Sequence, residues 1–298
     1  MASSGSVTGR TRQKYKKKSQ LRMVWQRFRK NKLAFIGLIV LLLLAAMAFS
    51  ADLIANYEED AIFQNAGSRL QPPSSEHWFG TDGFGRDLFA RVIFGARTSL
   101  SIGFTAIVLA LCCGVVIGSV AGYYGGWVDN LLMRAMDILL AIPNILMAII
   151  IVAVLGASTT NLLLALAVSE VPRSARVVRS AVLSIRDAEY IEAAVAYGAR
   201  DKRIILQHIL PNAIGPIIVQ STLSLANIIL NISFLSFIGL GVPSPTPEWG
   251  TILSENRQFM RNDPYLMYFP GLSIMIAVLS LNLIGDGLRD ALDPKLKN

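Results

Sequence analysis

The chain has 298 residues, of which 53% are hydrophobic and only 16% are charged, and its mean hydropathy is +0.50. A soluble domain usually carries about 25% charged residues, so this composition excludes an ordinary soluble protein and predicts a protein embedded in a bilayer. The formal net charge of +8 is concentrated near the N-terminus, where basic residues could bind nucleic acid or an anionic membrane surface.

Residues 1–32 are expected to form a basic tail, and no acidic residue lies between Arg10 and Lys32. Because an apolar run starts at Leu33, we interpret the tail as a cytoplasmic segment at the lipid surface and expect no nucleic-acid partner. The tail is too long and too basic for the start of a signal peptide. The first apolar segment, residues 33–55, is therefore expected to be a retained transmembrane helix.

A spanning helix needs about 20 mostly apolar residues. Five stretches satisfy this requirement, namely residues 33–51, 100–121, 138–155, 214–240 and 265–284. A sixth stretch, residues 157–178, is apolar only in its first half and then carries Glu170, Arg173 and Arg176. We still expect a full span there, with the arginines snorkelling to the cytoplasmic side. The prediction is an all-α, multi-pass bundle of about six transmembrane helices.

The distribution of basic residues predicts which loops face the cytoplasm. The tail, residues 173–203 and the C-terminus (291–298) are basic, so both termini are expected inside. Residues 56–96 and 241–264 balance their basic residues with acids, and both are expected outside, together with a short turn near Ala157. The first of these segments should pack on the outer face of the bundle, and residues 97–290 should form its core.

Two features indicate how the bundle is held together. Gly114 and Gly118 have the spacing that lets a neighbouring helix approach closely. The only cysteines, Cys112 and Cys113, are adjacent, and the two histidines are far apart, so we expect neither a disulfide nor a metal site.

The outer segments contain two polar clusters. Asp82, Gly83, Gly85, Arg86 and Asp87 do not have the spacing of a calcium loop, and we expect a glycine-rich turn held by an Asp–Arg pair. Glu248 and Trp249 are expected to face outward, although the tryptophan could also anchor the chain at the membrane interface.

Polar groups also occur within the spans. We expect Glu170 to pair with Arg173 or Arg176, and Asp286, Arg289 and Asp290 to form an interhelical salt bridge at the cytoplasmic end of the last span. Buried amides must be hydrogen-bonded, so the remaining polar residues either line a translocation path or join helices: Asn227, Asn231 and Asn282.

Residues 187–212 are polar enough to lie outside the bilayer. Helix-forming residues extend to Tyr197, and Gly198 then predicts a left-handed stop. A second helical piece has an apolar stripe, and Pro211 should force Leu210 out of helical geometry. The stripe consists of Ile204, Ile205, His208 and Ile209. The pattern predicts a cytoplasmic helix–turn–helix that is either a docking element or a surface loop without a partner.

The order Glu192-Ala193-Ala194, Gly198 and Ile209-Leu210-Pro211 resembles the cytoplasmic EAA loop of permeases of binding-protein-dependent ABC importers. The general pattern of that loop has isoleucine where this chain has His208, two residues before the Leu-Pro pair. A histidine followed by Ile-Leu-Pro-Asn is similar to the peptide-importer branch. Further stretches resemble the C-type permease of dipeptide, oligopeptide and nickel importers: residues 25–37, 79–100, 237–250 and 281–294.

The resemblance implies a type I ABC importer permease fold and a division of labour. This chain would pair with a second permease, two ATPase subunits that carry ATP and Mg, and an extracytoplasmic binding protein, and it would bind no cofactor itself. The sequence contains no G-x-x-x-x-G-K-[ST] phosphate loop, so it is not expected to be an enzyme. The residues expected to contact an ATPase subunit are Glu192, Ala193, Ala194, Gly198, Ala199, His208, Ile209, Leu210 and Pro211.

The function implied is import of di- or oligopeptides by alternating access, in the cytoplasmic membrane of a bacterium or archaeon. Import of nickel or another small solute is an alternative within the same family. An ion-coupled secondary transporter is disfavoured because we find no inverted repeat and only one intramembrane acid, Glu170. A membrane enzyme is disfavoured because no catalytic constellation lies within the spans.

Overall fold

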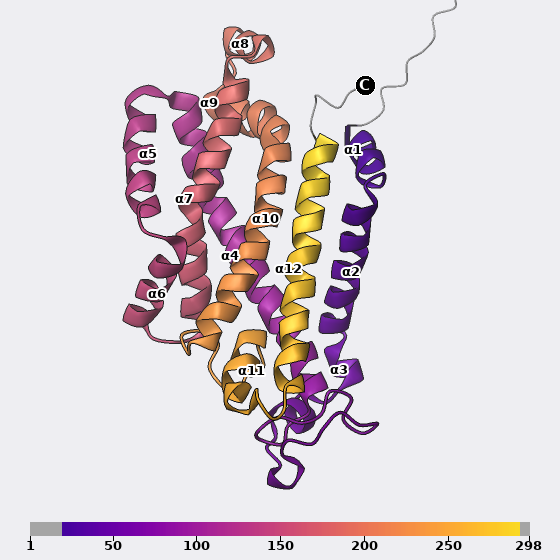
Figure 1. Cartoon of the computed structure of the whole chain (residues 1–298). Helices are drawn as coiled ribbons and strands as arrows, with labels where there is room; N and C mark the ends of the chain where they lie inside the picture. The colour runs from indigo at the N-terminus through magenta and orange to yellow at the C-terminus, as the bar shows by residue number, and fades with distance from the viewer. Residues whose placement is uncertain (1–19, 293–298) are drawn as a thin grey trace, which may run out of the picture.

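The computed structural model describes residues 20–292, and the secondary structure within them is helical, without strands. The helices lie side by side in an elongated bundle (Figure 1). Most of the basic tail lies outside the described residues, so its predicted contact with lipid remains a prediction. We call the two ends of the bundle the α8 end and the α11 end, after the short helices α8 (Glu189–Ala196) and α11 (Trp249–Asn256).

The main helices are α2 (Lys32–Phe49), α4 (Leu88–Tyr124), α5 (Gly126–Leu140), α6 (Asn144–Leu155), α7 (Thr159–Arg186), α10 (Leu210–Phe237) and α12 (Tyr265–Leu292). Four helices are long and apolar enough to cross a membrane: α2, α4, α12 and the continuous helix Asp201–Phe237 that ends with α10. The bent pair α5 and α6 can supply a fifth span. Helix α7 carries more charge, but its 28 residues run beside α4 along the bundle (Figure 1), in the position expected for the fourth span.

The third predicted span is not one straight helix. Helices α5 and α6 meet at an angle of 82°. Pro143 stands immediately before α6, and a proline lacks the N–H that would continue the helix and restricts the residue before it. The apolar run 138–155 therefore includes only the last turn of α5 together with α6.

The second span is longer than the apolar run that predicted it. Helix α4 starts at Leu88, where the Asp87 carboxylate accepts a 2.8 Å hydrogen bond from the Ala90 N–H. An acid at this capping position satisfies backbone donors that have no partner within the helix. Residues 88–96, expected to belong to the outer segment, are thus the first turns of α4, and Phe94 is buried there.

Helices α4 and α7 pack closely along a glycine seam. Gly114 faces Ser174, Gly118 faces Val178, and one turn further along α4 Gly122 faces Val182. A Cβ atom at Gly122 would lie 2.9 Å from the Val182 Cβ atom, so only glycine permits this approach. The predicted packing role of the glycine pair is confirmed, and the seam is one glycine longer.

Four charged side chains join the two outer segments at the α11 end. The Arg86 Nε atom lies 2.7 Å from Asp82 Oδ2, which confirms the predicted Asp–Arg pair. Glu255 of α11 also accepts from Arg86 at 2.7 Å and from Arg91 at 2.8 Å. Both arginines and Asp82 are fully buried. The outer segment and α11 therefore form one cap on the bundle, held by a buried network of two positive and two negative groups.

The prediction that Glu248 and Trp249 face outward is wrong, because both are fully buried. The Glu248 carboxylate caps α11 by accepting from the Thr251 N–H at 2.9 Å, and it also accepts from the Ser99 hydroxyl at 2.9 Å. The Trp249 indole donates to the Val92 carbonyl at 3.0 Å. These groups attach α11 to α4 instead of presenting it to a partner.

Short elements complete the chain. They are α1 (Gln20–Phe28), α3 (Ala51–Ile54), a π-helix at Tyr57–Ile62, a 3-10 helix at Ala66–Ser68, α9 (Asp201–Arg203), a π-helix at Ile204–Ile209 and a 3-10 helix at Arg257–Phe259. Phe28 of α1 is buried against Ala34 and Ile284 at the α8 end. This contact holds α1 beside the end of α12 (Figure 1).

Candidate coupling site

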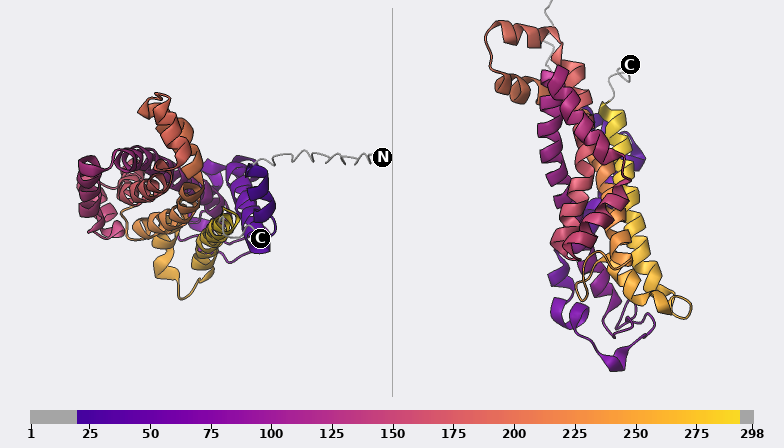
Figure 2. Two further views of the ribbon diagram at one scale, coloured as in Figure 1. Left: turned by 90° about the horizontal axis from the view of Figure 1, so that it is seen from above. Right: turned by 90° about the vertical axis from the view of Figure 1, so that its left-hand side faces the viewer.

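Helix α8 stands away from the rest of the molecule. It projects beyond the outline of the bundle in both views of Figure 2. Glu192 and Ala193 are exposed and Ala194 is half-buried. Large side chains nearby are also exposed, with Val195 at 53% and Tyr197 at 93%. Exposed aromatic and apolar side chains of this kind are typical of a protein contact.

Gly198 ends α8 in the way that the sequence predicts. Its φ of +78° lies in the left-handed region, and the Ala199 N–H donates to the Ala194 carbonyl at 3.1 Å. The Gly198 N–H donates to the Val195 carbonyl at 2.9 Å, which completes a Schellman motif. No atom lies within 4 Å of the place where a Cβ atom would be. The glycine therefore provides a turn and an open surface, and within this chain it relieves no steric clash.

Apolar contacts fix the base of this projecting element. Ile191 is the buried residue of α8, and it belongs to a cluster with Ile204, Ile209 and residues of α7 such as Val182. Ile205 and His208 are only half-buried. The predicted apolar stripe is therefore realised by Ile204 and Ile209, which join α8 to both α7 and the start of α10.

The expectation that Pro211 breaks the helix at Leu210 is wrong. Leu210 has helical dihedral angles, φ −57° and ψ −42°, and the helix continues from Asp201 to Phe237. The preceding residues form a π-helix, in which the Leu210 N–H donates to the Ile205 carbonyl. The wider π turn accommodates the proline, which cannot donate a hydrogen bond of its own. Of the two helices in the predicted helix–turn–helix, α8 is thus a separate short helix, whereas the second is continuous with α10.

A polar contact that the sequence did not suggest ties the loop to α4. Asp201 accepts hydrogen bonds from the Tyr123 and Tyr124 hydroxyls, at 3.0 and 3.2 Å. We call these three residues the tyrosine latch. An open hollow of about 740 Å³ lies between α8 and the latch, and Glu192 lines it. The signal available in the sequence was weak, consisting of two adjacent tyrosines before a Gly-Gly pair and an acid opening a short helix.

Residues 114–298 match the family described as "Binding-protein-dependent transport system inner membrane component", and residues 19–73 match "N-terminal TM domain of oligopeptide transport permease C". The chain belongs to the binding-protein-dependent transport permeases. It is therefore a multi-pass membrane component of an ABC importer.

Curated relatives resemble the permease over almost its whole length. The dipeptide transport system permease protein of Alkalihalophilus pseudofirmus is 51% identical over 282 residues, covering 94% of this chain and 91% of the relative. The oligopeptide permease of Bacillus subtilis is 42% identical, covering 91% and 88%. The glutathione permease of Escherichia coli O157:H7 is 44% identical, covering 92% and 90%.

The inward-facing structure of the methionine ABC transporter MetNI shares the fold. One chain of it superposes with a TM-score of 0.56 at 20% sequence identity, covering 69% of this chain and 98% of that one. The expected fold class, a helical ABC importer permease, is confirmed.

Charged residues within the permease bundle join its helices. Glu170 is buried and accepts from the Ser224 hydroxyl at 2.5 Å and from the Asn144 amide at 3.2 Å. The Arg173 Nε atom lies 4.0 Å from its carboxylate, so that predicted pair is present but long. Arg176 instead pairs with Asp137 of α5 at 2.7 Å. Glu170 therefore connects α6, α7 and α10 close to the break between α5 and α6.

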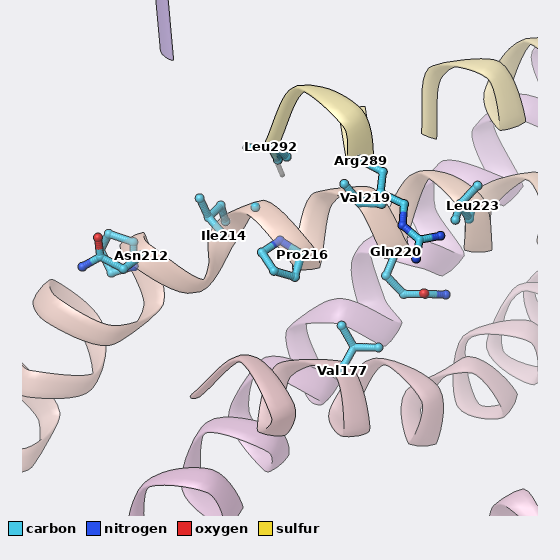
Figure 3. Close-up of a pocket in the computed structure, with 11 residues that line it drawn as sticks. Val177, Asn212, Ile214, Pro216, Val219, Gln220, Leu223, Arg289 and Leu292 are labelled. Atoms are coloured by element: carbon cyan, nitrogen blue, oxygen red, sulfur yellow. The ribbon is translucent and has the colours of Figure 1, made fainter. Parts of the chain in front are cut away.

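The salt bridge predicted at the end of α12 is absent from the described residues. Asp290 accepts a 3.3 Å hydrogen bond from the Asn31 amide, and neither Asp286 nor Arg289 has an ionic partner among the side chains of residues 23–292. Arg289 instead projects into a hollow between α7, α10 and α12, shown in Figure 3. This hollow has a volume of about 640 Å³ and opens near the α8 end.

The three asparagines predicted to line a path or join helices are on α10 and α12. Asn227 is exposed, and its amide donates to the Leu223 carbonyl of its own helix at 3.1 Å. Asn231 and Asn282 are half-buried. Among the described residues, Asn227 is thus hydrogen-bonded within its own helix, and for the other two either role remains a prediction. None of the three lines the 640 Å³ hollow.

Proposed function

We propose that this permease is one of two membrane subunits of an ATP-driven importer of di- or oligopeptides, working by alternating access in a bacterial or archaeal cytoplasmic membrane. Dipeptide, oligopeptide and glutathione permeases are its relatives by name, and glutathione is itself a tripeptide. An extracytoplasmic binding protein delivers the peptide at the α11 end. Two partner subunits bind ATP and Mg and hydrolyse the ATP at the α8 end, which is cytoplasmic.

The projecting helix α8 is the observation that carries this proposal. Its exposed residues, including Glu192, Ala193 and Gly198, form the surface that docks on an ATPase subunit. Ile209 is fully buried and does not take part in that contact. It supports α8 from beneath, through Ile191 and Ile204.

The attachment of α8 explains how ATP-driven movement reaches the bundle. The apolar base joins α8 to α7 and α10, and the tyrosine latch joins the second half of the loop to α4. Because α4 and α7 are packed along the glycine seam, they move together. Displacement of α8 by an ATPase subunit is therefore transmitted to α4, α7 and α10 at once, which is the movement that alternating access requires.

The test uses two substitutions at Gly198. Tryptophan should abolish docking, because a bulky side chain would occupy the open surface that the partner approaches. Asparagine tolerates left-handed backbone and is small, so Gly198→Asn should retain docking. Both variants are purified with the ATPase subunits and measured for peptide uptake and for binding-protein-stimulated ATP hydrolysis in proteoliposomes.

Gly239 provides a matched control for backbone strain. It has a φ of +84°, the same hydrogen-bond pattern and no atom within 4 Å of a Cβ position. Gly239→Trp should lower thermal stability as much as Gly198→Trp does, yet it should leave assembly with the ATPase subunits intact. Normal assembly and normal stimulated hydrolysis in Gly198→Trp would refute the docking role.

A further inference from the structure

The hollow between α7, α10 and α12 has the size and lining of a small-molecule site. Its volume of about 640 Å³ lies within the range of about 300–1,000 Å³ that is usual for ligand pockets. Val177, Ile214, Val219 and Leu223 contribute apolar walls. Polar groups come from Asn212 and Gln220 of α10 and from Arg289 of α12.

Arg289 brings a positive charge on an exposed side chain to these apolar walls. Figure 3 shows its guanidinium group directed toward Gln220 and into the space above Val177. No acidic side chain of residues 23–292 lies within salt-bridge distance of it. A guanidinium group has a planar fork of donors that matches a carboxylate. The chemistry of the hollow therefore suits a small anion with an apolar body.

The amide side chains add hydrogen-bonding capacity. The Asn212 amide nitrogen donates to the His208 carbonyl at 2.6 Å, and the Gln220 amide nitrogen donates to the Ser224 hydroxyl at 3.2 Å. Each nitrogen is thus engaged within α10 or its extension, while each amide oxygen can still accept. Peptide N–H groups are donors of the kind that such oxygens would bind.

Helix geometry aligns this hollow with the asparagines deeper in the bundle. Seven residues are almost two turns of an α-helix. Asn227 therefore lies on the face of α10 that carries Gln220, and Asn282 lies on the face of α12 that carries Arg289. One further amide therefore lies on the same face of each helix, toward the α11 end.

We propose that Arg289 binds the C-terminal carboxylate of the transported peptide in this hollow, while Gln220 accepts a hydrogen bond from the peptide backbone. The inference rests on the proposed function, because it assigns the chemical feature of the substrate that this part of the permease recognises. The side chains of the peptide lie against the apolar walls, which tolerate different sequences. The carboxylate is common to all unmodified peptides, so one arginine serves many substrates.

The test compares a dipeptide with its C-terminal amide in proteoliposomes that contain the complete importer. Alanyl-alanine and alanyl-alanine amide are each supplied at concentrations that saturate the binding protein, so that differences arise at the permease. Arg289→Gln should lower uptake of the free dipeptide about tenfold, as expected for loss of a charge-assisted contact, with little change for the amide. Arg289→Lys keeps the positive charge but loses the planar pair of N–H donors, so it should lower uptake of the free dipeptide less than Arg289→Gln does. Arg134→Gln removes an exposed arginine of α5 outside the hollow and should change neither rate.

The outcomes separate this inference from the proposed function. If the unmodified importer transports neither peptide, the proposed function fails and the inference fails with it. If it transports peptides but Arg289→Gln lowers both rates equally or neither, the carboxylate site is refuted and the proposed function stands. A defect that disappears in vesicles without anionic phospholipid would assign Arg289 to a lipid headgroup and also refute the inference. If Arg289→Gln fails to assemble, uptake of the two peptides is compared in Arg289→Lys. A larger loss for the free dipeptide than for the amide supports the carboxylate site, and equal losses or none refute it.

Discussion

Replacing Glu255 by glutamine tests the charge network that holds the outer cap. Glu255 is 11% exposed and accepts from Arg86 and Arg91 through one carboxylate oxygen, at 2.7 and 2.8 Å. Its other oxygen accepts from the Ser244 hydroxyl at 2.5 Å. The network holds two positive and two negative groups, so Glu255→Gln leaves two buried guanidinium groups facing Asp82 alone.

The size of the effect follows from burial. Removing one partner of a buried ion pair typically costs about 3–5 kcal/mol, because the remaining charge is neither solvated nor compensated. Arg91 is fully buried, and an arginine side chain is effectively always protonated in proteins. Its guanidinium group therefore stays charged near pH 7 and cannot escape the cost by losing a proton. For a chain of 298 residues the loss corresponds to a fall in Tm of about 5–8 °C.

Thermal unfolding of the purified permease in nanodiscs measures this loss. Glu76→Gln is the control, because Glu76 is an exposed acid of the same outer segment without an ion pair among the described residues. We expect the Tm of Glu76→Gln to stay within 1–2 °C of the unmodified protein, which is about the effect of an ordinary surface substitution. Equal Tm values for Glu255→Gln and Glu76→Gln would show that the network does not stabilise the cap.

Two further substitutions test the elements that we propose to transmit movement. Gly118→Val places a branched side chain against Val178 and the backbone at Ala175, so it should lower the free energy of unfolding by about 1–3 kcal/mol. The control Gly271→Val meets no atom within 4 Å and should lower that free energy much less. Equal unfolding midpoints of the two variants in denaturant would contradict the packing role of the glycine seam. Asp201→Asn weakens the tyrosine latch by about 1–2 kcal/mol, so amide hydrogen exchange in residues 200–209 should accelerate about 5–30-fold. Glu189→Gln changes an exposed acid of α8 and is the control. If exchange in these residues is no faster in Asp201→Asn than in the control, the latch is excluded.

Local signals in the sequence predicted the long helices, because hydropathy adds up along a segment and needs no knowledge of its neighbours. The bend at Pro143 was missed for the same reason, since the apolar run continues through the proline without a change in composition. The burial of Trp249 was missed because its indole binds Val92, 157 positions earlier in the chain. A Glu-Trp pair in a predicted outer loop gives no indication of such a partner.

In the candidate site, too, local features were predicted from the sequence and long-range contacts were missed. The left-handed turn at Gly198 depends only on the end of α8, and it was predicted correctly. The tyrosine latch joins Asp201 to residues 77 and 78 positions away, which no local pattern reveals. Pro211 was misjudged because the π-helix before it changes the geometry in which a proline is tolerated.

The length of α10 gives the permease a lever along the bundle. Its 28 residues, at a rise of about 1.5 Å each, span about 42 Å. A tilt of about 5° imposed at one end would move the other by about 4 Å, most of the rise of one helical turn. A small movement passed from α8 to the start of α10 would thereby become a displacement of about 4 Å at the other end of the helix, without any residue of α10 changing its backbone conformation.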